Sequence, residues 1–76
     1  MNLIDEITNA VTLEIPESEV FVTSNDDVHF SLRIVSSKLS KLNRIEQHKM
    51  IYQSLKKRFG ENWSNTIHAL EIIVEK

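Results

Sequence analysis

The sequence contains no cysteine, one proline and one glycine among its 76 residues. Without cysteine the chain can form neither a disulfide framework nor a thiolate metal site of its own. No apolar run in it approaches the roughly 20 residues that a membrane-spanning helix needs. The first residues also lack the basic start and the apolar stretch of an export signal. We therefore expect a cytoplasmic protein that does not contact a membrane.

The length of the chain limits what it can build. A chain of 76 residues buries only about 60% of the surface that it exposes when unfolded, so one core must serve every element. We predict a single domain over residues 1–76. An enclosed active site with two walls and a lid needs a longer chain, so the sequence favours a binding protein over an enzyme.

Basic residues are absent from positions 1–32, which hold seven acidic residues. Residues 33–58 reverse this pattern with eight basic residues and one acidic residue, although the whole chain has a formal net charge of −2. Such a block can contact an anionic partner, either phosphate or the acidic face of a protein. Alternatively it is only the solvated face of a helix, which we favour for any single base. The residues that we assign to a nucleic-acid or partner surface are Arg44, Lys49, Lys56 and Lys57.

Two segments have the apolar spacing of amphipathic helices. Residues 2–13 repeat apolar side chains at helical intervals. Residues 43–59 begin with Asn43 and Glu46 in the spacing of a capping box, and Gly60 supplies a left-handed stop. On a wheel of about 100° per residue, this second helix directs one apolar arc toward the core. The arc consists of Ile45, His48, Ile51, Tyr52, Leu55 and Phe59.

Three segments favour β-strands. Residues 19–23 are strand-prone, and residues 28–35 alternate apolar with polar side chains. The link 24–27 is short and made of turn formers, so an antiparallel hairpin is the economical connection. Residues 66–75 are rich in β-branched side chains and predict a third strand, parallel to one hairpin strand because a helix precedes it. Residues 36–42 fit either a turn or a single helical turn.

One face of residues 28–35 is wholly apolar and must be covered. The helix over residues 43–59 provides that cover, because its apolar arc has the matching character. The elements therefore predict an α+β domain, an α-β-β-α-β sandwich. Both helices should lie on one face of a mixed three-stranded sheet.

Three segments together resemble the BolA-like family. They are residues 29–36 (HFSLRIVS), residues 47–55 (QHKMIYQSL) and residues 67–70 (IHAL). The match covers roughly residues 28–73 in consistent order, and the combination is more specific than any single motif. The fold of this family is similar to the type II KH arrangement, which agrees with the topology expected from periodicity.

The resemblance implies a non-enzymatic partner of monothiol glutaredoxins. In that partnership the two proteins and glutathione share a [2Fe-2S] cluster, in iron-sulfur cluster assembly and trafficking or in iron-linked regulation. The BolA-like subunit offers a histidine from the start of its last strand, and that position here is His68. The second ligand of the family is a His or Cys in the loop between the first two strands. Residues 24–27 contain neither.

This departure leaves the second ligand open. His29 lies just beyond the loop, and Asp26 and Asp27 offer carboxylates within it. Carboxylates suit harder metals than a cluster iron, so His29 is the better of these choices. Alternatively the cluster is held with fewer ligands from this chain, or the two proteins pair without one. Imidazole can replace thiolate on a cluster iron, as Rieske-type centres show.

The ring residues of the predicted helix 43–59 are interpreted as structural. His48 lies near the centre of the apolar arc, so we interpret it as packed or hydrogen-bonded. Tyr52 shares that arc and is assigned to the core, because a single aromatic residue seldom makes a base-stacking platform. His29 faces away from the apolar side of its strand, and surface and functional roles both remain open for it. The functional hypothesis depends on His68.

The alternative function is DNA binding and transcription regulation through a KH-like scaffold and the basic block 33–58. KH domains grip the nucleic-acid backbone with a Gly-x-x-Gly loop, and the only glycine here is Gly60 at a helix end. RNA binding of the KH type is therefore disfavoured, whereas phosphate contacts to DNA remain open. A third alternative is an adaptor that binds neither metal nor nucleic acid.

Overall fold

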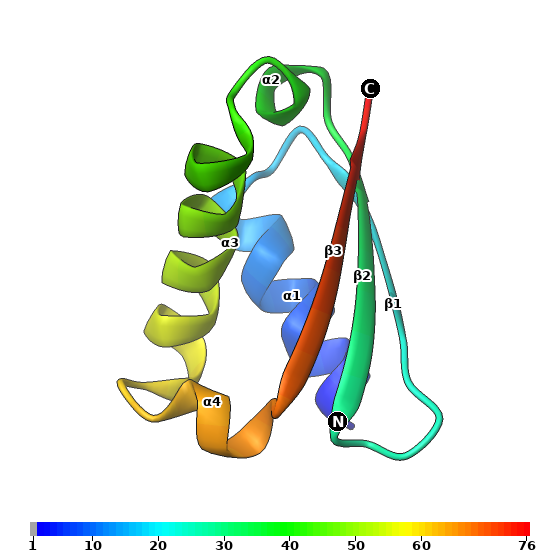
Figure 1. Cartoon of the computed structure of the whole chain (residues 1–76), viewed down its shortest axis with the longest axis vertical. Helices are drawn as coiled ribbons and strands as arrows, with labels where there is room; N and C mark the ends of the chain where they lie inside the picture. Colours follow the sequence, from blue (N-terminus) through cyan, green and yellow to red (C-terminus); the bar gives the residue numbers. More distant parts are fainter. Residues whose placement is uncertain (1) are drawn as a thin grey trace.

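The computed structural model describes residues 2–76 and contains one three-stranded sheet in the order β1-β2-β3. Strand β1 is antiparallel to β2, and β3 is parallel to β2. Helices α1 and α3 cover the same face of this sheet (Figure 1). The predicted α+β class, the hairpin and the mixed sheet are confirmed. The elements are α1 (Leu3–Glu14), β1 (Glu19–Thr23), β2 (His29–Val35), α2 (Ser37–Ser40), α3 (Arg44–Phe59), α4 (Trp63–Thr66) and β3 (Ala69–Glu75).

The ends of α3 follow from local side-chain chemistry. The predicted capping box is confirmed, because Glu46 N donates to Asn43 Oδ1 at 2.9 Å and Asn43 N donates to Glu46 Oε1 at 3.4 Å. At the other end Gly60 N donates to Lys56 O at 2.8 Å. Gly60 has φ +90° and ψ −175°, so φ is positive as predicted but the residue is extended rather than left-handed helical. Only glycine adopts this region readily.

The core lies between the sheet and the two long helices. Alternate side chains of β2 point into it, and α1 and α3 contribute their apolar stripes. Ile67, between α4 and β3, closes one end and is almost fully buried. The buried apolar residues are Ile7, Val11, Ile15, Phe30, Leu32, Ile34, Leu39, Ile51, Leu55 and Ile67.

The predicted apolar arc of α3 is only partly correct. Ile51 and Leu55 are buried, but Ile45 is 79% exposed and Tyr52 is 38% exposed. The assignment of Tyr52 to the core is therefore wrong. Ser54 is buried instead, and its Oγ donates to the Ile51 carbonyl oxygen at 2.6 Å. The buried stripe is shifted because α3 packs against α1, while Ile51 and Leu55 share the core with the side chains of β2.

Two short helical turns adjust the predicted boundaries. Residues 36–42 contain the single turn α2, whose first turn is capped by Ser36 Oγ accepting from Leu39 N at 3.0 Å. The third strand was predicted from residue 66 but begins at Ala69, because α4 occupies Trp63–Thr66. Within residues 2–76 no helix is both long and apolar enough to cross a bilayer.

Candidate functional site

His29 opens β2 and is held by Asp26 in the preceding loop. Asp26 Oδ2 lies 2.6 Å from His29 Nδ1, while Oδ1 accepts the backbone N–H groups of His29 at 2.9 Å and Val28 at 3.1 Å. These bonds, led by the backbone N–H of His29, hold the pKa of Asp26 well below its usual range. The ionised carboxylate stabilises the tautomer of the neutral imidazole that carries its proton on Nδ1. In this tautomer the free lone pair is on Nε2.

The loop itself is closed by a second polar side chain. Ser24 Oγ donates to the carbonyl oxygen of His29 at 2.7 Å and accepts the backbone N–H of Asp27 at 2.9 Å. Asp27 has φ +63°, a conformation that Asp tolerates better than most residues. The carboxylate of Asp26 is therefore engaged in orienting His29, which makes it a weaker candidate ligand than the sequence alone indicated.

His68 lies between α4 and β3 and is exposed to solvent. Its backbone N–H donates to the carbonyl oxygen of Val28 at 3.1 Å, and that of Ala69 donates to the same oxygen at 3.3 Å. His29 is the register partner of Ala69, so His29 and His68 lie at the same end of the sheet. No cluster of three or more potential metal ligands occurs among residues 2–76. A metal at this end would need ligands from a second molecule.

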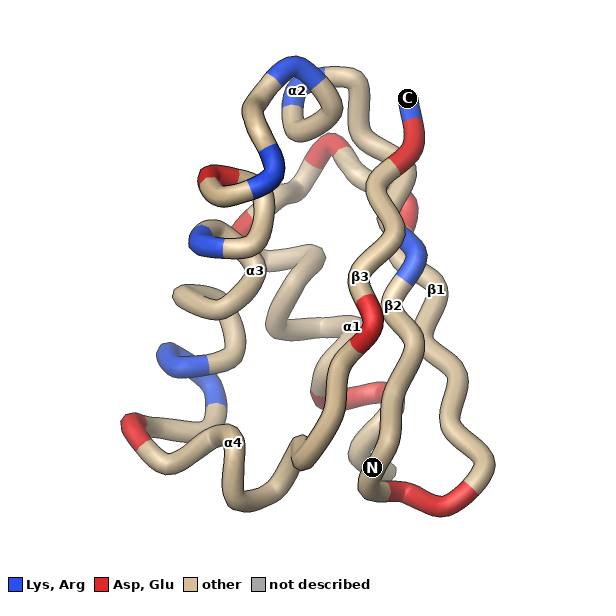
Figure 2. The backbone as a smooth tube through the Cα atoms, in the orientation of Figure 1, with Lys and Arg blue, Asp and Glu red and all other residues tan. Residues whose placement is uncertain are grey.

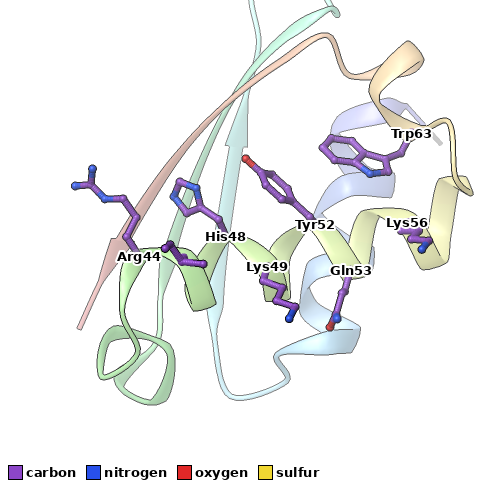
Figure 3. A pocket seen from close by; sticks show the side chains of 8 residues that line it. Arg44, His48, Lys49, Tyr52, Gln53, Lys56 and Trp63 are labelled. Atoms are coloured by element: carbon purple, nitrogen blue, oxygen red, sulfur yellow. The ribbon is translucent and has the colours of Figure 1, made fainter.

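His48 lies on α3 and is half-buried. Its ring meets that of Tyr52 edge-on, with centroids 5.9 Å apart, and Tyr52 stacks on Trp63 at 5.3 Å. The three rings form a row along one side of α3 (Figure 3). His48 thus has a packing role in this aromatic row.

A groove with a volume of about 550 Å³ runs along the exposed side of α3. Figure 3 shows the aromatic row on one side and Lys49, Gln53 and Lys56 on the other. The sequence interpretation missed this groove because it assigned Ile45 and Tyr52 to the core. Their separation of seven residues places them on one side of a helix, but this spacing does not tell whether that side is buried or exposed. The groove is lined by Arg44, Ile45, His48, Lys49, Tyr52, Gln53, Lys56 and Trp63.

Some residues of the predicted basic surface form ion pairs, and others do not. Figure 2 shows basic residues along α2 and α3, with acidic residues on α1 and in the β1–β2 loop. Lys57 Nζ lies 2.9 Å from Glu14 Oε2, and Arg58 pairs with Glu6, so these bases join α3 to α1. Of the four predicted surface bases, Lys57 is thus neutralised, while the other three line the groove.

Lys56 and the two bases nearer the start of α3 differ in their pairing. Lys56 Nζ lies 3.1 Å from Glu61 Oε1, in an exposed pair that stabilises the fold little. Arg44 and Lys49 form no ion pair with any of the described residues. The unpaired positive charge of α3 is therefore concentrated at the groove.

Comparison with known proteins gives consistent matches. The family model for BolA-like proteins matches residues 6–75. A BolA-like protein of Dictyostelium discoideum is 35% identical over 72 residues, which cover 92% of this chain and 60% of that protein. The chain therefore spans only 60% of the length of this curated relative.

Solved structures show the same fold. BolA1 from Arabidopsis thaliana superimposes with a TM-score of 0.75 at 21% identity, over 99% of this chain and 92% of that one. A BolA protein homologue from Coxiella burnetii gives 0.72 at 20% identity, over 100% and 92%. The BolA domain of SufE1 from Arabidopsis thaliana gives 0.71 at 25% identity, over 99% and 92%.

Proposed function

This chain belongs to the BolA-like protein family, and we propose that it is a non-enzymatic partner of a monothiol glutaredoxin with which it shares a [2Fe-2S] cluster. The cluster is cargo of the pair, and glutathione takes part through the glutaredoxin. The role of such a complex is iron-sulfur cluster assembly and trafficking, or iron-linked regulation.

The observation that carries this proposal is the placement of His29 and His68 at one end of the sheet. His68 is exposed, and its backbone is bonded to Val28, the residue before His29. The backbones of His29 and His68 lie at the same end of the sheet, so each residue can offer one imidazole to a cluster whose other ligands come from a second protein. Because the chain has no cysteine, the sulfur ligands come from the glutaredoxin and glutathione.

His29 is the better candidate for the second ligand because Asp26 orients its ring. A carboxylate that accepts the Nδ1 proton of a histidine fixes the ring and makes Nε2 more basic, as is common beside metal-bound histidines. The Asp26–His29 pair at 2.6 Å has this arrangement. The family carries its His or Cys within the loop between the first two strands, which here is residues 24–27. His29 takes that role from just after the loop.

Anaerobic reconstitution with a monothiol glutaredoxin, glutathione, iron and sulfide tests this function. We expect a heterodimer whose visible absorption and circular dichroism differ from those of the glutaredoxin alone. His68→Ala should change these spectra, and His29→Ala should change them to a smaller extent. His48→Ala is the matched control, because His48 belongs to the aromatic row and not to this end of the sheet. Spectra that are identical for the wild type and His68→Ala would exclude His68 as a ligand.

DNA binding through the basic block is the weaker candidate. Lys57 and Arg58 are engaged with Glu14 and Glu6, which lowers the charge that α3 presents to phosphate. A salt titration against a random duplex distinguishes the two functions. Affinity that vanishes at moderate salt without sequence preference indicates nonspecific attraction only.

A further inference from the structure

Neither His29 nor His68, the residues that carry the function proposed above, lines the groove along α3. We propose that it binds an acidic amphipathic helix of a partner protein. This inference stands apart from the glutaredoxin complex and depends on three properties of the groove: its apolar surface, its charge and its length.

The first property of the groove is that large apolar side chains are exposed together in it. Ile45 is 79% exposed, and Tyr52 is exposed beside the half-buried Trp63. Scattered apolar residues on a surface need no explanation, but a grouped set rimmed by polar residues marks an interaction site. A partner that covers Ile45 and the edges of the two rings would remove this surface from water.

The charged residues that line the groove are all basic. Arg44, Lys49 and Lys56 line it, and no acidic side chain does. Arg44 and Lys49 also lack an ion pair with any of residues 2–76. Complementarity therefore selects an acidic partner. A symmetric dimer through this groove is disfavoured, because it would bring the same three bases of each copy together.

The length and spacing of the groove favour a helix as the bound element. From Arg44 to Lys56 the helix axis rises about 18 Å, which matches a partner helix of about three turns. Ile45 and Tyr52 are separated by two turns of α3, so a partner with apolar residues at i, i+4 and i+7 can contact both. The acidic residues of that partner would flank its apolar stripe.

Nucleic acid fits the same groove less well. Proteins that bind single strands stack bases on free aromatic faces. Here Tyr52 and Trp63 are stacked on each other with an interplanar angle of 28°, so the facing sides of both rings are already covered. The most exposed residue of the groove, Ile45, offers no hydrogen bond to a base or a phosphate.

A designed peptide tests the proposal directly. The probe is a capped helical peptide of about four turns with Leu at i, i+4, i+7 and i+11, Glu on both flanks and Ala elsewhere. The comparison peptide carries Lys in place of every Glu. Trp63 is the only tryptophan of the chain, so its emission reports binding in the groove. We expect the acidic peptide to shift this emission to saturation and the basic peptide to bind at least about tenfold more weakly.

Variants of exposed residues keep the test independent of folding. Ile45→Glu and the double variant Arg44→Glu, Lys49→Glu should each weaken the acidic peptide about tenfold or more. Leu13→Glu is the matched control, because Leu13 is 82% exposed and lies on α1 outside the groove. Circular dichroism establishes that all variants retain the wild-type fold.

Five results would overturn the proposal. They are equal binding of the two peptides, an equal loss of affinity in Leu13→Glu, retained affinity in Ile45→Glu, displacement of the acidic peptide by an oligonucleotide, and a wild-type dimer that Ile45→Glu dissociates. The last result, measured by light scattering, would assign the groove to self-association. Retained peptide affinity in Ile45→Glu would show that the peptide binds elsewhere.

Discussion

Identical substitutions at two isoleucines of α3 test which face of this helix is buried. Ile51 is 0% exposed, whereas Ile45 is 79% exposed. Ile51→Ala deletes buried carbon atoms and leaves a cavity, so we expect it to lower the free energy of unfolding by about 2–4 kcal/mol. Ile45→Ala removes atoms that already contact water, and Ala is the better helix former. We expect that change to stay within about 0.5 kcal/mol.

Urea unfolding followed by far-ultraviolet circular dichroism measures both values. Because both variants replace Ile by Ala within one helix, differences in helix propensity cancel in the comparison, and burial alone gives a difference of about 2–4 kcal/mol. In a domain of this size each kcal/mol shifts Tm by about 4–8 °C, so thermal melts resolve the pair as well. A loss of about 2 kcal/mol or more in Ile45→Ala would place Ile45 in the core, as the helical wheel predicted, and would refute the groove.

Two further predictions concern the loop and the end of α3. Folding lowers the pKa of Asp26 from 3.8, so the native state binds fewer protons than the unfolded state and loses stability as the pH falls below that value. Asp26→Asn should make the free energy of unfolding fall less steeply as the pH is lowered. Urea unfolding at a series of pH values measures this, and the same pH dependence in the variant and the wild type would contradict the hydrogen bonds assigned to Asp26. Gly60 has φ +90° with nothing near its added Cβ, so Gly60→Ala should cost about 1–3 kcal/mol through backbone strain alone. Gly60→Asn should not restore this loss, because ψ −175° lies outside the left-handed helical region that Asn tolerates.

The features that the sequence predicted correctly are those decided by neighbours along the chain. The capping box of Asn43 and Glu46 needs only the two side chains and the first turn of α3. The β1–β2 hairpin follows from turn formers between alternating segments, and the parallel β3 follows from the helix before it. The position of His68 at the entrance to β3 is predictable for the same reason.

The features that it missed depend on packing between distant segments. A helical wheel identifies apolar positions, but the part of the arc that is buried depends on how α3 sits between the sheet and α1. Pairs such as Lys57–Glu14 join residues 43 positions apart, and no local pattern predicts them. The start of β3 was misplaced because β-branched composition does not exclude a helical turn at Trp63–Thr66.

The groove along α3 and the end of the sheet with His29 and His68 can be tested independently. Acidic residues of α1 pair with Lys57 and Arg58 at the end of α3, while Arg44 and Lys49 line the groove without an ion pair to any of the described residues. His29 and His68 lie at one end of the sheet, and neither of them lines the groove. A glutaredoxin complex that survives Ile45→Glu but changes its spectrum in His68→Ala would therefore assign the cluster to the histidine end and leave the groove to another partner. Loss of the complex in Ile45→Glu, with an unchanged spectrum in His68→Ala, would place the glutaredoxin itself on α3.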